Sequence, residues 1–99
     1  MPTFMCFLNW TDQGAKAAKD VEKRHQAAKI LAEKLGGKLL SAYVTTGQYD
    51  VVATLEMPDG DAMVKFASGV SAGGNARTTT VRAYTPSDFS NLAAKVPKA

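Results

Sequence analysis

The first segment of the chain, Thr3–Trp10, is apolar on both faces of the strand that it would form. Phe4, Cys6, Leu8 and Trp10 alternate with Met5 and Phe7. A strand with one face in water alternates apolar and polar residues, whereas a strand that is covered on both sides stays apolar throughout. The pattern therefore predicts a central strand.

A helical pattern follows this strand. Thr11 or Asp12 can cap its start, and Asp20 is a second possible start. Apolar residues then recur every three or four positions, at Val21, Ala28, Leu31 and Leu35. Gly36-Gly37 predicts the end of the helix in the left-handed conformation.

Two apolar segments, KLLSAYVTT and YDVVATLEM, flank Gly47-Gln48 and predict a hairpin. A two-residue loop of type II′ takes glycine at its first central position, where φ is positive, and Gly47 fits that place. The predicted register divides the third strand into two faces, Tyr49, Val51, Ala53 and Leu55 on one and Asp50, Val52, Thr54 and Glu56 on the other. Asp50 then heads the more polar face.

The last third of the chain predicts a helix, a strand and a short terminal helix. The segment of the second helix begins with Pro58 and an acidic cap at Asp59 or Asp61, and it ends at Gly73-Gly74. NARTTTVRAY is a β-branched fourth strand. In TPSDF, Thr85 caps a helix with Pro86 at its first position, and this helix ends before Pro97.

The order β-α-β-β-α-β with a tail helix predicts an α+β, ferredoxin-like domain over residues 1–99. Two helices would cover one face of the sheet. The other face would carry Met5, Phe7, Val52 and either Leu40-Ala42-Val44 or Leu39-Tyr43. Such a face is too apolar to stay in water, so we expect a second copy packed sheet to sheet as a dimeric α/β barrel.

Composition narrows the class of protein. The chain has 99 residues, 45% of them hydrophobic and 21% charged, with a formal net charge of +3 and a single cysteine. Its basic residues alternate with acids along the first helix, which is typical of a solvated face, so we expect no nucleic-acid partner. No segment predicts a signal peptide, a membrane span, a metal cluster or a cofactor motif, and we expect a cytoplasmic protein.

Three segments together resemble a known family. The opening MPTFMCFLNWTDQG, the hairpin TTGQYDVVATLEMPDGDAM and the close GNARTTTVRAYTPSDF resemble the GYD-domain family, which is named for a Gly-x-Tyr-Asp motif like Gly47, Tyr49 and Asp50. The resemblance reaches to about Phe89. It implies a ferredoxin-like, dimeric α/β-barrel protein of prokaryotic type and implies no established activity.

The hairpin is also similar to the ligand-binding domain of leucine-responsive (Lrp/AsnC) regulators. In those proteins a Gly-x-x-Asp hairpin lies near a small-molecule site between subunits, and Gly47 and Asp50 match that pattern. No helix-turn-helix pattern precedes the first strand here. The likeness thus implies that the chain binds a small effector molecule but does not recognise DNA through a helix-turn-helix.

Six residues are candidates for a ligand site: Asn9, Trp10, Tyr43, Tyr49, Asp50 and Arg77. Asp50 either binds a polar ligand group at the subunit interface or fixes the hairpin by accepting bonds from turn amides or a partner arginine. Trp10 either stacks on a planar ligand or plugs the end of the sheet. Arg77 and Arg82 face opposite sides of the fourth strand, and an Asp50–Arg77 pair between subunits is one hypothesis.

Two further residues bear on the question of chemistry. His25, the single histidine, lies mid-helix beside the apolar stripe, and we expect it to be solvated or half-buried rather than a haem ligand. Pro2 would become a secondary amine if Met1 were removed, as in amino-terminal-proline tautomerases. Neither residue has a companion motif that predicts a reaction.

These observations predict a homo-oligomeric small-molecule-binding or assembly module with a ligand site at the subunit interface. The alternative is a small, cofactor-independent α/β-barrel enzyme, monooxygenase-like or isomerase-like, that acts on a planar substrate. A deep apolar cavity lined by aromatic residues would favour the enzyme, and a filled barrel interior would favour assembly.

Overall fold

The computed structural model describes residues 1–98 and has the predicted order of elements. The strands are β1 (Thr3–Trp10), β2 (Lys38–Val44), β3 (Val51–Glu56) and β4 (Ala76–Ala83). The helices are α1 (Asp12–Lys16), the 3-10 turn η1 (Ala18–Asp20), α2 (Val21–Lys34), α3 (Gly60–Ala72) and α4 (Pro86–Ala93).

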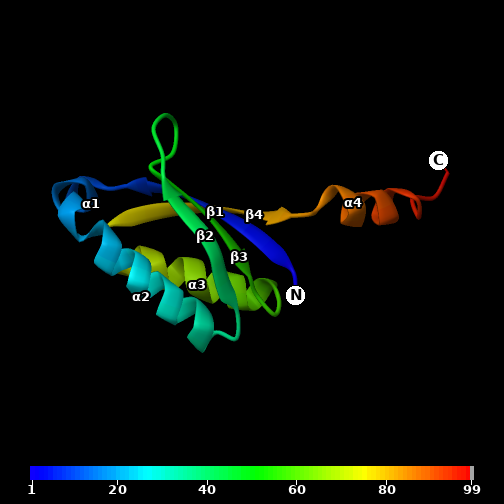
Figure 1. Cartoon of the computed structure of the whole chain (residues 1–99), viewed down its shortest axis with the longest axis horizontal. Coiled ribbons are helices and arrows are strands. Elements are labelled where there is room, and N and C mark those ends of the chain that lie inside the picture. The colour runs from blue at the N-terminus through cyan, green and yellow to red at the C-terminus, as the bar shows by residue number, and fades with distance from the viewer. Residues whose placement is uncertain (99) are drawn as a thin grey trace.

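The four strands form one antiparallel sheet in the order β2-β3-β1-β4. Helices α2 and α3 lie on one face of this sheet, and the opposite face carries no helix in Figure 1. The ferredoxin-like prediction is confirmed. The central place of β1 explains why both of its faces are apolar.

The core lies between the sheet and the two helices. Phe4 and Cys6 of β1 and Leu55 of β3 point into it, and Met63 and Phe66 of α3 pack against them. Helix α2 contributes less, because Ala32 is its one buried residue. The helix layer is therefore tightly packed at α3 and looser at α2.

Most predicted helix ends are confirmed. Both proposed starts of the first helical region are used, since Thr11 caps α1 and α2 begins directly after Asp20. Asp59 and Thr85 accept backbone N–H bonds at the starts of α3 and α4. Glycines with positive φ follow the two long helices, namely Gly36 (83°) and Gly74 (78°).

The hairpin between β2 and β3 is longer than predicted. Thr45 N donates to Asp50 O (2.8 Å), so residues 46–49 lie outside the pairing and the loop is not a two-residue type II′ turn. The positive φ of Gly47 (110°) is confirmed. The side chain of Thr45 closes the loop by donating to Tyr49 O (2.6 Å), a bond that the turn prediction did not consider.

A bulge in β2 decides which of its residues face the helices. Leu39 pairs with Leu55 and Ser41 pairs with Thr54, so Leu40 is an extra residue in the strand. The bulge shifts the alternation by one position. As a result Leu39 and Ala42 both pack against the core, Tyr43 is on the open face, and neither predicted set of residues was right.

The tail helix α4 stands apart from the rest of the chain, beyond the end of β4 (Figure 1). Phe89 (63% exposed), Leu92 (51%) and Val96 (70%) leave their apolar side chains in water. Phe89 and Leu92 lie three residues apart on one side of α4, and Val96 follows beyond the end of the helix. Helix α4 thus presents an apolar face that the described part of the chain does not cover.

Candidate functional site

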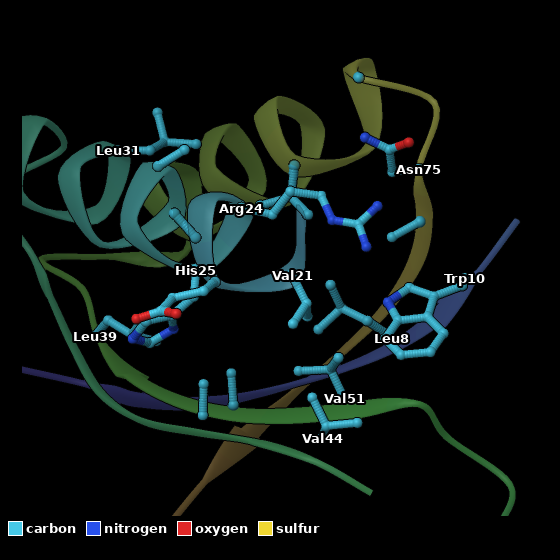
Figure 2. Close-up of a pocket in the computed structure, with 18 of the residues that line it drawn as sticks. Leu8, Trp10, Val21, Arg24, His25, Leu31, Leu39, Val44, Val51 and Asn75 are labelled. Carbon is cyan, nitrogen blue, oxygen red and sulfur yellow. The ribbon is translucent and has the colours of Figure 1, made fainter. Parts of the chain in front are cut away.

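A cavity of about 410 Å³ lies between α2 and the sheet. Figure 2 shows the strands below it, with Leu8 and Val51 pointing up into it, and α2 above it. Trp10 lies at one end, where β1 finishes, and His25 and Leu39 lie toward the other. Cavities of this size hold small organic ligands.

The cavity exists because its wall contains many small residues. Seven of the residues that line it are alanine or glycine: Ala27, Ala28, Ala42, Ala53, Gly69, Gly73 and Ala76. Larger side chains at these positions would fill the space between α2 and the sheet. The sequence does not predict the cavity, because alanine in a helix or strand is equally typical of a close-packed core.

The end of the cavity near Trp10 is held by a compact set of hydrogen bonds. Thr11 N donates to Asn75 O (3.1 Å), and the Thr11 hydroxyl donates to Gly74 O (2.6 Å) and accepts from Gly14 N. Gly14 is buried so close to the Asn75 carbonyl that a side chain there would overlap it. The start of α1 is thereby fixed against the segment that precedes β4.

Asp50 fixes the backbone of Trp10. Its Oδ2 atom accepts a hydrogen bond from Trp10 N (2.8 Å), while its own N–H donates to Leu8 O (2.9 Å). The regular pairing of β1 with β3 ends at Leu8, so the carboxylate supplies the acceptor for Trp10 beyond that point. Asp50 stands in front of the apolar strand β3, where its carboxylate continues the hydrogen bonding of β1 beyond Leu8. It thereby holds Trp10, which lies at the end of the cavity.

The polar groups of the cavity wall come mainly from α2. Arg24 and His25 are half-buried and line the cavity together with the exposed Glu22. Both terminal nitrogens of Arg24 donate to one oxygen, Gly14 O, at 3.4 and 3.3 Å. His25 is half-buried, which agrees with the prediction that it is solvated or half-buried. Its place in a cavity wall was not predicted. The helix phase could have indicated this place, since His25 lies four residues after Val21 and three before Ala28, on the same side of α2.

The structure brings together two of the six predicted site residues, Trp10 and Asp50. Tyr49 packs on Phe7, with ring centroids 4.7 Å apart, which places it on the open face and not with Val51 as predicted. That prediction failed because Tyr49 belongs to the loop and does not follow the alternation of β3.

The other three predicted residues lie on the open face of the sheet. Tyr43 is 70% exposed and pairs with Val52. Asn9 pairs with Arg77, so both side chains share that face. Of these open-face residues, Asn9, Arg77 and Tyr49 do not line the cavity, whereas Tyr43 does. The open face is accessible to a second copy.

Residues 1–98 lack the features of two other classes of site. No helix in this range is both long and apolar enough to cross a membrane. The same residues contain no group of three or more His, Cys, Asp or Glu side chains placed to hold a metal ion.

Three solved structures share the fold. The crystal structure of FFRP-DM1 is 19% identical, covers 85% of this chain and all of that one, and has a TM-score of 0.61. The leucine response regulatory protein LrpA of Mycobacterium tuberculosis is 13% identical with a TM-score of 0.56, over 85% of this chain and 51% of its own. TTHA0845 from Thermus thermophilus is 22% identical with a TM-score of 0.53, over 86% and 95% of the two chains.

A comparison with curated proteins finds no match. A family model described as the GYD domain matches residues 4–93, which includes nearly every residue of the strands and all of α4. The resemblance that the three segments carried is thus confirmed over nearly the whole chain, and the protein belongs to the GYD-domain family.

Proposed function

We propose that this protein is a cytoplasmic, homo-oligomeric module that binds a small, largely apolar ligand in the cavity between α2 and the sheet. The observation that carries the proposal is the cavity itself, about 410 Å³ with Trp10 at one end and a few polar groups in its wall. Ligand sites in proteins combine these features, an apolar interior and a small number of polar side chains. In this proposal the ligand site lies within one chain and not between subunits.

The homo-oligomer is supported by the open face of the sheet. Met5, Phe7 and Val52 lie on it half-buried, and Tyr43 and Val81 are exposed there (70% and 43%). An apolar face of this kind is normally covered by protein. A second copy would cover this apolar face on both chains at once, because a twofold interface is self-complementary.

Filling the cavity tests the proposal. Ala28 lies on α2 and lines the cavity, so Ala28→Leu would occupy the space that a ligand needs. We expect the wild-type protein to bind a neutral aromatic probe, naphthaleneethanol, in calorimetric titration, and the variant to bind it at least about tenfold more weakly. Cavity filling commonly stabilises a protein by about 0.5–2 kcal/mol, so the variant should also unfold at a higher temperature.

Ala72→Leu provides the matched control, because Ala72 is an exposed residue of α3 outside the cavity wall. It should leave probe binding unchanged. Equal binding by the Ala28→Leu variant would place the ligand elsewhere, and a wild-type protein that binds no aromatic or aliphatic probe would overturn the proposal.

A second candidate function uses the same cavity. The protein would be a small, cofactor-independent enzyme acting on a planar substrate, and the observation in its favour is that His25 and Trp10 both line the cavity. Imidazole is the commonest general acid or base in enzymes. Conversion of a bound ligand that is lost in His25→Gln, with binding retained, would favour the enzyme over the binding module.

A further inference from the structure

We propose that the ligand of this cavity is a carboxylic acid with an aromatic or aliphatic body, and that Arg24 binds its carboxylate. This inference rests on the proposed function, because it names the class of ligand for the same cavity. The body would lie on the apolar floor formed by the strands, and the acid group would lie at the end where Trp10 and Gly14 meet α2.

The first argument is the position of Arg24. It is half-buried in the wall of a cavity whose floor is apolar, with Leu8 and Val51 pointing into it. In Figure 2 its guanidinium reaches toward the end of the cavity where Trp10 lies, and its bonds to Gly14 O are on that side. A charged group in such a place is favourable when a group of opposite charge comes within reach.

The second argument is the set of bonds that Arg24 makes. A guanidinium has five N–H donors in a planar fork. Within residues 1–98 the hydrogen bonds of Arg24 both go to the single oxygen Gly14 O, at 3.4 and 3.3 Å, longer than the usual N–H···O distance of about 2.9–3.0 Å. Gly14 O therefore engages the fork only weakly and leaves donors for a carboxylate, the group whose geometry matches it.

The third argument concerns the surroundings of Arg24. The cavity borders the first turn of α2, where Val21 and Glu22 line it, and the positive end of a helix favours an anion. Glu22 is the opposing consideration, because its carboxylate would instead attract a cation. Glu22 is exposed, however, whereas Arg24 is half-buried, so charge interactions at Glu22 are more strongly screened by water.

Three probes that share a naphthalene ring and differ in their polar group separate an anionic, a neutral and a cationic ligand: naphthaleneacetate, naphthaleneethanol and naphthaleneethylamine. Calorimetric titration gives each affinity. The indole N–H resonance of Trp10, the single tryptophan of the chain, reports whether the probe enters the cavity. We expect the acid to bind at least about tenfold more tightly than the alcohol, and the amine to bind more weakly than the alcohol.

Variants of Arg24 then assign the effect. Arg24→Gln should reduce the preference for acid over alcohol to about onefold, and Arg24→Lys should keep part of the preference. Lys23→Gln is the matched control, because Lys23 is exposed, is adjacent on α2 and does not line the cavity. It should leave the preference unchanged, which excludes an effect of net charge. Thermal unfolding of each variant confirms that it is folded.

The outcomes distinguish this inference from the proposed function. Equal binding of acid and alcohol, or a preference that survives in Arg24→Gln, would overturn the role of Arg24 and leave the cavity as a binding site. Tightest binding of the amine would assign the ligand to Glu22 instead. Failure of all three probes to bind would overturn the ligand class together with the proposed function.

Discussion

At the scale of single residues, Asp50 has a role that its neighbours in the sequence do not reveal. The chain motif Gly-x-Tyr-Asp suggests a site in which these residues act together, but their side chains go to different places. Gly47 provides a positive φ in the loop, Tyr49 packs on Phe7, and Asp50 binds the backbone of Trp10, which is 40 residues away in the chain. The motif is therefore explained by structure without assigning it any chemistry.

Replacing Asp50 tests this role. Asp50→Ala leaves Trp10 N without its acceptor at the half-buried end of the sheet, and we expect the free energy of unfolding to fall by about 1–2 kcal/mol. Asp50→Asn keeps an acceptor oxygen and should lose about half as much. Urea unfolding measures both.

Glu33→Ala, at an exposed position of α2, is the control and should change the free energy of unfolding by less than about 0.5 kcal/mol. If Asp50→Ala were as stable as this control, the bond to Trp10 would not hold the strand end.

Cys6 predicts a pH dependence of stability. Burial raises the pKa of its thiol above the ordinary value of 9.0, and a side-chain hydrogen bond with Thr80 offsets part of that rise. The unfolded chain therefore loses the thiol proton at a lower pH than the folded one. The stability that the neutral thiol contributes is present below pH 9.0 and is lost as the pH rises toward the raised pKa.

The measurement is urea unfolding of the wild type and of Cys6→Ala on both sides of pH 9.0. We expect the difference in unfolding free energy between the two proteins to shrink as the pH rises. A difference that is constant across this range would contradict the shifted pKa. In the folded protein the same thiol should react slowly with alkylating reagents, since only the thiolate is nucleophilic.

At the scale of elements, the sequence predicts regular segments better than their junctions. The two apolar faces of Thr3–Trp10 placed β1 at the centre, and the caps at Asp59 and Thr85 marked helix starts, because these signals are local. The longer hairpin and the bulge at Leu40 depend on which neighbour each residue pairs with. Alternation alone does not contain that information, so the faces of Tyr49 and of β2 were predicted wrongly.

The candidate site was only partly predictable for the same reason. Trp10 and Asp50 were named from their chain positions, and they do meet. The cavity beside them depends on small residues from strands and helices that are distant in sequence. The spacing of Arg24 and His25 from Ala28 puts them on the side of α2 that faces the sheet, but it does not predict that a cavity lies there.

Helix α4 is the element whose stability depends most on a partner. An isolated helix of eight residues is marginal in water, and most of its stability has to come from packing. We expect Phe89 and Leu92 of this helix, with Val96 just beyond its end, to pack on a second copy. Leu92→Glu should then weaken self-association at least about tenfold in sedimentation equilibrium and leave the unfolding of the monomer nearly unchanged.

The control for this prediction is Asn91→Glu, which adds the same charge on the other side of α4. It should not alter self-association. An equal effect of both variants would indicate simple charge repulsion, and no effect of either would exclude α4 from the contact.

At the scale of the whole molecule, the two faces of the sheet differ in what covers them. One face has α2 and α3 with the cavity beneath them, and the other is bare (Figure 1). If the bare face is the contact between copies, ligand binding and assembly use opposite sides of the sheet. Each could then be removed without the other.

Val81 tests that separation, since it is 43% exposed, pairs with Met5 on the open face and does not line the cavity. We expect Val81→Asp to weaken self-association at least about tenfold while naphthaleneethanol binds as before. Val64→Asp, at an exposed position of α3 (64%), is the control for adding an acid to an apolar surface residue. Self-association that resists Val81→Asp would place the contact between copies elsewhere.

The alanine and glycine residues of the cavity wall have a consequence for how such a protein diverges. Each is a position where one substitution subtracts from the space inside without altering the strands, caps and turns that define the fold. Gly69 shows how close the limit is, because a methyl group there would already press on Leu31. Related proteins could thus keep one fold while single substitutions in the cavity wall change the size of the ligand that fits. Members with identical topology could then bind molecules of quite different width.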